Sequence, residues 1–219
     1  MSLYIILNII ILGSTLIFSF DKRVSFYKVW PKMGLIYLTV SVFFIVWDMW
    51  ATHQGHWSFN PRYTGVKIGN LPLGEILFFI SVPYSCMFLW EIVNYFFPKT
   101  HNRKKSKSIV VTVIVMLLFA VAAIVFWQYE YTRTVCIVAI PLPLLLYFYY
   151  PYPLVDTRSI VYCGAITVAF VITNGILTGL PVVNYGEGHY LGLRVLTIPV
   201  EDFVYNFCLI GYSLLIRIK

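Results

Sequence analysis

The chain has 219 residues, of which 60% are hydrophobic and only 11% are Asp, Glu, Lys or Arg. A soluble domain usually carries more than twice that share of charged residues, so this composition excludes a soluble globular protein and predicts a chain embedded in lipid. A formal charge of +7 could suggest a nucleic-acid partner. The positions of the basic residues indicate membrane topology instead.

Seven apolar stretches are each close to the roughly 20 residues that a helix needs to cross a bilayer. In chain order they cover residues 3–20, 33–52, 72–97, 108–127, 132–150, 159–180 and 197–216. The fourth and fifth could be read as one long helix, but Glu130 and Arg133 would be costly to bury in mid-span, and Pro141 and Pro143 interrupt the fifth. The sequence therefore predicts an all-α integral membrane protein with about seven transmembrane helices.

The basic residues concentrate on one side of these predicted helices. Twelve lie in the segments after the first, third, fifth and seventh stretches, and four lie in the opposite loops. The positive-inside rule then places the N-terminus outside and the C-terminus in the cytoplasm of a multi-pass protein of the cell membrane. The basic run at residues 102–107 is expected to anchor this topology by contacting anionic membrane lipid, and nucleic acid is not expected as a partner.

Near the start of two of the stretches, a proline is followed within three residues by acidic residues. Residues 71–79 read LPLGEILFF, and residues 198–206 read IPVEDFVYN. Aligning the two motifs, 127 positions apart, matches the first three stretches with the last three and leaves the fourth as a connector. This pattern predicts two parallel three-helix repeats, at residues 1–107 and 132–219, joined by a connector helix at 108–131.

The alignment also predicts an acidic site at one depth in the membrane. Asp48, Glu75, Glu201 and Asp202 all fall near the outer ends of their helices, where a parallel repeat could bring them together around a cavity. An acid behind a proline is also an ordinary helix start, where it caps the exposed N–H groups. Two copies at membrane depth favour function, because ionisable groups in a bilayer are expensive. Glu201 and Asp202 point about 100° apart on a helix, so only one needs to face the cavity.

Aromatic side chains surround these acids. Aromatic residues are expected at membrane interfaces in any case, but those beside an acid could also stabilise a carbocation through their ring faces. Asn174 is added to this set because it falls close to the position of Asp48 in the alignment. The predicted substrate-binding residues are Trp47, Trp57, Phe78, Phe79, Asn174 and Tyr205.

Other motifs are weak. His53 and His56 stand three apart in a Gly-containing loop, which alone is poor support for a metal site, so none is predicted. The four cysteines lie inside apolar stretches without paired spacing and are expected to be core residues. No flavin, dinucleotide or P-loop fingerprint is present, and no cofactor is predicted.

The loops before the acidic helices carry a family resemblance. Residues 55–61 (GHWSFNP) and 69–79 (GNLPLGEILFF), with 184–186 (NYG) and 198–203 (IPVEDF), resemble the two repeats of the small integral-membrane lycopene cyclases. These are the heterodimeric or fused enzymes of bacteria, archaea and fungi, and the resemblance covers nearly the whole chain. The first repeat of that family usually has two acids after the proline. Here Gly74 occupies the first of those positions and leaves Glu75 alone.

The resemblance implies a lycopene β-cyclase, an isomerase of carotenoid biosynthesis that acts without a redox cofactor. A neutral carboxylic acid would protonate the ψ-end of lycopene, and a carboxylate would remove a ring proton afterwards. Glu201 or Asp202 is expected to be the acid, with Glu75 as its partner or the base and Asp48 in support.

Several alternatives stay open at this point. The chain could cyclise another carotenoid, such as a C50 or monocyclic one, or it could hydrate the end group. It could also be a seven-helix proton-coupled carrier, in which acids in the membrane relay protons. A last alternative is a non-enzymatic carotenoid-binding or assembly protein. The sequence leaves open whether the protein forms a homo-oligomer.

Overall fold

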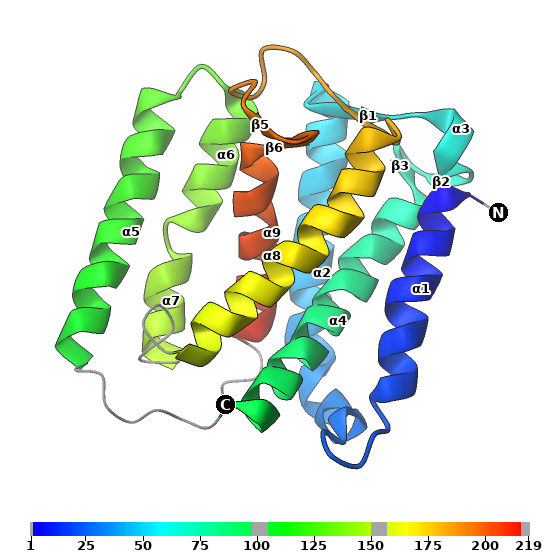
Figure 1. Ribbon diagram of the computed structural model, residues 1–219. Helices are drawn as coiled ribbons and strands as arrows, with labels where there is room; N and C mark the ends of the chain where they lie inside the picture. Colours follow the sequence, from blue (N-terminus) through cyan, green and yellow to red (C-terminus); the bar gives the residue numbers. More distant parts are fainter. Residues whose placement is uncertain (1, 98–104, 150–156, 216–219) are drawn as a thin grey trace.

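The computed structural model describes residues 2–97, 105–149 and 157–215 (Figure 1). Within these ranges the protein is mostly helical, with nine α-helices, one 3-10 helix and six short strands. The helices are α1 (Leu3–Phe18), η1 (Phe26–Val29), α2 (Trp30–Gln54), α3 (Pro61–Thr64), α4 (Leu73–Phe96), α5 (Lys105–Val125), α6 (Glu130–Ala139), α7 (Leu142–Tyr149), α8 (Thr157–Gly179) and α9 (Val200–Leu214). The strands are β1 (Trp57–Phe59), β2 (Lys67–Ile68), β3 (Leu71–Pro72), β4 (Val183–Tyr185), β5 (Arg194–Val195) and β6 (Ile198–Pro199).

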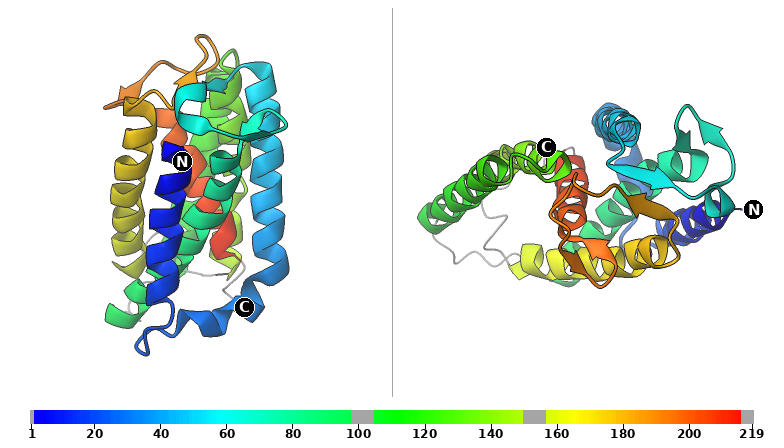
Figure 2. Two further views of the ribbon diagram at one scale, coloured as in Figure 1. Left: turned by 90° about the vertical axis from the view of Figure 1, so that its right-hand side faces the viewer. Right: turned by 90° about the horizontal axis from the view of Figure 1, so that it is seen from above.

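The long helices run side by side, and all six strands gather at one end of the bundle, which we call the strand end (Figures 1 and 2). Local sequence explains several helix boundaries. Pro31 stands at the start of α2, and the helix ends at Gly55, whose φ of 82° is easily adopted without a side chain. Pro141 and Pro143 separate α6 from α7, because proline lacks the N–H that a continuous helix requires.

Each of the seven predicted apolar stretches contains a helix, and α5 and α6 are separate, as expected. By length and composition, three helical segments of the described part of the chain can cross a membrane, namely α4 (Leu73–Phe96), α6 and α7 taken together (Glu130–Tyr149) and α8 (Thr157–Gly179). A fourth is added if the bent pair Phe26–Gly34 and Tyr37–Gln54 forms one span. The remaining apolar helices, such as Leu3–Phe18, are shorter. These helices agree with a membrane location. The count of seven spans stays a prediction.

Two equivalent hairpins precede the acidic helices. β2 pairs with β3 before α4, and β5 pairs with β6 before α9, with the registers Lys67↔Pro72 and Arg194↔Pro199. A residue with positive φ occupies the same place in both turns, Gly69 at 63° and Leu196 at 58°. The second value is uncommon for a leucine. Equivalent residues of the two hairpins, such as Gly69 and Leu196, are 127 positions apart. The two acidic helices therefore start from matching turns.

A third strand pair connects the two halves of the chain. β1, in the loop after α2, runs antiparallel to β4, in the loop after α8, with Trp57 opposite Tyr185 and Phe59 opposite Val183. Backbone hydrogen bonds between residues so far apart in sequence fix the two loops to each other at the strand end. The side chains of these strands therefore have a defined position above the helices.

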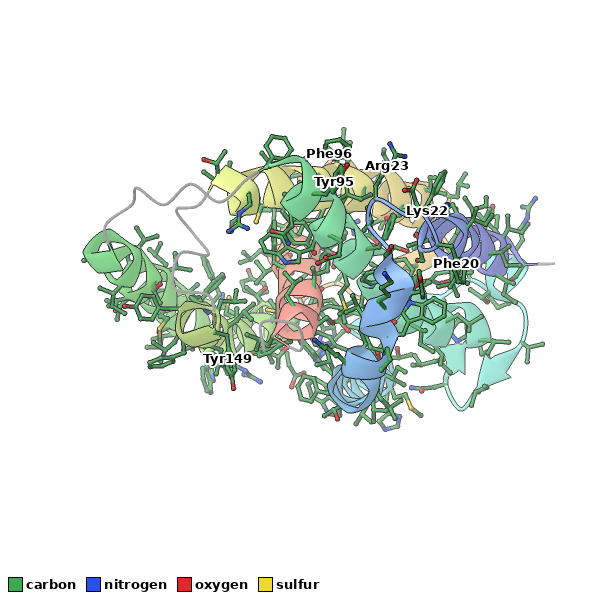
Figure 3. The ribbon with its side chains drawn as sticks, turned by 90° about the horizontal axis from the view of Figure 1, so that it is seen from below. Phe20, Lys22, Arg23, Tyr95, Phe96 and Tyr149 are labelled. Carbon is green, nitrogen blue, oxygen red and sulfur yellow. The ribbon has the colours of Figure 1, made fainter. Side chains whose placement is uncertain are left out.

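Basic and aromatic residues mark the opposite end of the bundle. Figure 3 views this end and labels Lys22 and Arg23 with the aromatic residues Phe20, Tyr95 and Phe96. The predicted basic anchors at 99, 103, 104, 217 and 219 lie outside the described residues. The orientation of the chain in the membrane therefore stays a prediction.

Candidate active site

Three carboxyl groups from three helices line one cavity at the strand end. Asp48 lies near the end of α2, while Glu75 and Asp202 lie in the first turns of α4 and α9. Their side chains line a cavity of about 70 Å³ and are buried. Pro72 and Pro199 hold an extended backbone immediately before α4 and α9, which starts both helices at equivalent points. Three of the four acids that were predicted to converge therefore line the same cavity.

Asp202 has three hydrogen-bond donors. The Tyr131 hydroxyl donates to Oδ1 at 2.7 Å, Asn174 Nδ2 donates to Oδ2 at 2.9 Å, and the Tyr185 hydroxyl also donates to Oδ2. Burial, together with the negative charge of Asp202 beside it, raises the pKa of Tyr185, so its hydroxyl keeps the proton that it donates. Three donors complement a negatively charged carboxylate.

Asp48 and Glu75 have fewer partners. Trp57 Nε1 donates to Asp48 Oδ1 at 2.6 Å, while Asp48 Oδ2 is buried and accepts no hydrogen bond from the described residues. The hydroxyl of Tyr4, from α1, donates to Glu75 Oε2. A buried carboxyl oxygen without a partner is uncommon and calls for an explanation such as a proton or a ligand.

The two tyrosines that contact acids occupy equivalent positions. Tyr4 and Tyr131 are 127 positions apart, the same separation as Glu75 and Asp202. Each donates its hydroxyl to the acid 71 residues further along the chain, Tyr4 to Glu75 and Tyr131 to Asp202. Sequence reasoning missed both tyrosines. Extending the alignment of the acidic motifs back to the start of the chain, and so past residue 132 in the second copy, would have found them.

Glu201 does not line this cavity. Its Oε1 accepts hydrogen bonds from Thr132 Oγ1 at 2.6 Å and from the backbone N–H of Leu191 at 2.9 Å. The side chain is buried, and these contacts connect α9 to α6 and to the loop between β4 and β5. Of the adjacent acids in the second motif, Asp202 faces the cavity and Glu201 joins neighbouring segments.

Close packing explains why the first motif has a glycine where the second has Glu201. A Cβ atom on Gly74 would lie 2.6 Å from the Cβ of Tyr4, closer than real side chains approach. Asn8 Nδ2 on α1 also donates to the carbonyl oxygen of Gly74 at 2.8 Å. The contact between α1 and α4 therefore leaves no room for a second acid, and Glu75 stands alone.

Aromatic rings form most of the remaining cavity wall. Of the predicted substrate-binding residues, Trp57, Phe78, Phe79, Asn174 and Tyr205 line it. Trp47 does not, but its ring packs against that of Tyr205 with 4.7 Å between centroids. The lining residues that sequence reasoning missed are Tyr4, Phe59, Tyr131, Phe170, Val183, Tyr185, Asn206 and Leu209.

A larger cavity of about 280 Å³ lies on another side of α9, beside α5, α7 and α8. Its wall includes Phe119, Leu142, Ile166 and Ile210, and no acidic side chain of the described residues contributes to it. The buried acids Asp48, Glu75 and Asp202 line the smaller cavity instead.

Comparison with known proteins gives one match. The family model described as Lycopene cyclase matches residues 1–93 and 128–217. These two ranges contain every acid and tyrosine of the cavity, and they leave out α5. No curated protein and no solved structure matches the chain significantly.

Proposed function

Because the chain belongs to the lycopene cyclase family, we propose that it converts the acyclic ψ-ends of lycopene into β-rings, giving γ- or β-carotene. The observation that carries this proposal is the cavity in which Asp48, Glu75 and Asp202 meet among aromatic rings. Buried carboxyl groups can donate a proton to a substrate and accept one from it in a cavity that excludes water. The reaction class is an isomerisation.

The proposed reaction conserves every atom of the substrate. A carboxylic acid protonates the terminal double bond of the ψ-end, which leaves a tertiary carbocation. The neighbouring double bond attacks this cation and closes a six-membered ring, and the charge moves to a ring carbon. A carboxylate then removes one ring proton and the β-ring double bond forms. One proton enters and one leaves, so no oxidant or reductant is consumed.

The hydrogen bonds of the cavity support a division of roles. Three donors at Asp202 favour its negatively charged form, which suits the base and the counter-charge to the cation. Asp48 and Glu75 have one donor each from a side chain of the described residues, and Asp48 has a free buried oxygen. We assign the proton donor to this Asp48–Glu75 side of the cavity. This assignment replaces the expectation that Glu201 or Asp202 is the acid.

The aromatic wall has two roles in this proposal. The ring faces of residues such as Trp57 and Phe78 attract a positive charge near them. They also exclude water, which would otherwise capture the cation as a hydroxylated end group. A volume of about 70 Å³ has room for only a few water molecules. Entry of a carotenoid end group therefore requires these side chains to move outward.

We also propose that two parallel three-helix repeats, residues 1–107 and 132–219, surround this single site, with residues 108–131 as the connector. The matching hairpins before α4 and α9 support this. The equivalent Tyr4–Glu75 and Tyr131–Asp202 pairs also support the repeat, and they extend its second copy back to Tyr131. Seven spans with the N-terminus outside follow from this arrangement and from the distribution of basic residues.

The proposal is tested with purified protein in lipid vesicles that contain lycopene and no added cofactor, with protein-free vesicles as the control. We expect a cyclic product with the same mass as lycopene, identified by chromatography and mass spectrometry. Unchanged lycopene with folded, inserted protein would overturn the assignment of lycopene as the substrate. A product of different mass would overturn isomerisation.

A further inference from the structure

Three side chains of metal-binding type meet above the acidic cavity. They are His56, between α2 and β1; Glu130, the first residue of α6; and His189, in the loop between β4 and β5. One candidate ligand atom from each lies within 4.8 Å of the others. The spacing of His53 and His56 alone is poor support for a metal site, and the structure groups His56 with two distant residues instead.

The distances come close to those of a tetrahedral metal site. Zn²⁺ binds imidazole nitrogen and carboxylate oxygen at about 2.0–2.2 Å, which places its ligands roughly 3.3–3.6 Å apart. His56 Nε2 and Glu130 Oε2 are 3.2 Å apart, already near that separation. The rings of His56 and His189 have centroids 4.9 Å apart. A shift of about 1.5 Å or less would bring the third ligand into position.

The backbone around these residues is held in place without a metal. The N–H of His56 donates to Ala51 at 3.0 Å, and the carbonyl oxygen of His56 accepts from Gly186 at 2.8 Å. The carbonyl oxygen of His189 accepts from the N–H of Tyr131 at 2.8 Å. These bonds connect the three ligand-bearing segments to one another. Metal sites rely on such outer contacts to orient their ligands.

The buried imidazole of His56 is under-satisfied. The side chain is fully buried, and its ring has one hydrogen-bond partner, Glu130, while Nδ1 has none among the described residues. Arg133 lies 3.4 Å from Glu130 Oε1, the other oxygen of that carboxyl, and leaves Oε2 directed at the histidine.

Each ligand is close in sequence to a residue that holds an acid. Trp57, next to His56, donates to Asp48, and Tyr131, next to Glu130, donates to Asp202. Leu191, two residues after His189, donates its N–H to Glu201. We propose that His56, Glu130 and His189 bind one divalent transition-metal ion of the zinc type, which fixes the three segments that cover the acidic cavity. Three protein ligands leave one position for water.

The test uses the full chain, purified in detergent with a tag that contains no histidine and treated with a chelator before dialysis. Binding is measured with Zn²⁺ by calorimetry and with Co²⁺ by its visible absorption. Mg²⁺ serves as the control ion, because it prefers oxygen ligands to imidazole nitrogen. We expect one Zn²⁺ per chain and a higher melting temperature with Zn²⁺. His189→Ala should lose both effects, and Glu130→Gln should bind at least about tenfold more weakly.

The control is His53→Ala, because His53 is an exposed histidine outside the cluster. It should bind Zn²⁺ as the wild type does. His56→Ala would create a cavity at a fully buried position and could destabilise the fold. The test therefore relies on His189→Ala and Glu130→Gln, whose wild-type side chains are only half-buried. Folded wild type that binds no stoichiometric Zn²⁺, or His189→Ala that binds it as well as wild type, would overturn the proposal. The result is independent of whether the cavity cyclises lycopene.

Discussion

In the proposed reaction, single hydrogen bonds set the division of roles among the acids. Tyr131→Phe and Tyr4→Phe each remove one hydroxyl that donates to an acid of the cavity. A hydrogen bond to a charged group contributes about 1.5–3 kcal/mol. We therefore expect initial cyclisation rates to fall by roughly tenfold or more, with the larger loss at Tyr131. The measurement is the rate per folded protein in vesicles.

Tyr162→Phe is the matched control, because this buried tyrosine donates to the backbone oxygen of Cys86, away from the acids. It should keep nearly the wild-type rate. Equal losses in all three tyrosine variants would contradict a specific role for Tyr4 and Tyr131.

The sequence alone identified the acids of the site, but it did not identify most of the side chains that contact them. The cost of a carboxyl group in lipid draws attention to Glu75 and Asp202, and the alignment pointed to Asn174, which contacts Asp202. Tyr4 was not singled out, since tyrosine is common at membrane interfaces. Tyr185 was noted only as part of the motif at 184–186, and not as a partner of an acid. Their role depends on where a hydroxyl points, which only the fold determines.

At the scale of elements, the contact between α1 and α4 depends on Gly74. Gly74→Ala would place a Cβ 2.6 Å from the Cβ of Tyr4, and overpacking of this kind costs about 1–3 kcal/mol. Gly164→Ala is the control, because no atom lies within 4 Å of its added Cβ in α8. We expect a lower melting temperature for Gly74→Ala and an unchanged or higher one for Gly164→Ala, measured in detergent. A Gly74→Ala protein as stable as wild type would show that α1 can move away.

The elements themselves were largely predictable, because their signals are local. Pro141 and Pro143 indicated the break between α6 and α7, and Pro72 and Pro199 indicated the starts of α4 and α9. The environment of Glu201 was not predictable. Thr132 and the N–H of Leu191 reach it from α6 and from a loop, and no local pattern indicates such contacts.

At the scale of the molecule, both halves are needed for one site. Glu75 and Asp202 belong to different halves, which α9 joins through its contacts with α2 and α4, and β1 joins through its pairing with β4. A break between residues 101 and 102 lies outside the described ranges and leaves these contacts intact. We expect the fragments 1–101 and 102–219 to cyclise lycopene when co-expressed and not when expressed alone, judged by pigment chromatography. Activity of either fragment alone would contradict a shared site.

The arrangement of the whole chain was predictable only in outline. Hydropathy located the helices, because apolar runs of this length are a strong signal. The strand pairing between the two long loops was not foreseen, since β1 and β4 have three residues each and no distinctive alternation. That pairing is what places Trp57 and Tyr185 over the acids.

The most direct test of the shared acidic cavity compares two adjacent residues. Lycopene-accumulating cells would express wild type, Asp202→Asn or Glu201→Gln, with equal protein levels in the membrane checked and pigments resolved by chromatography. Wild type should convert lycopene to γ- or β-carotene, and Asp202→Asn should reduce conversion at least about 100-fold, because it removes a general acid–base group. Glu201→Gln should keep most of the activity, since Gln can accept the same hydrogen bonds from Thr132 and Leu191. Near-normal conversion by Asp202→Asn, with loss in Glu201→Gln, would contradict the account.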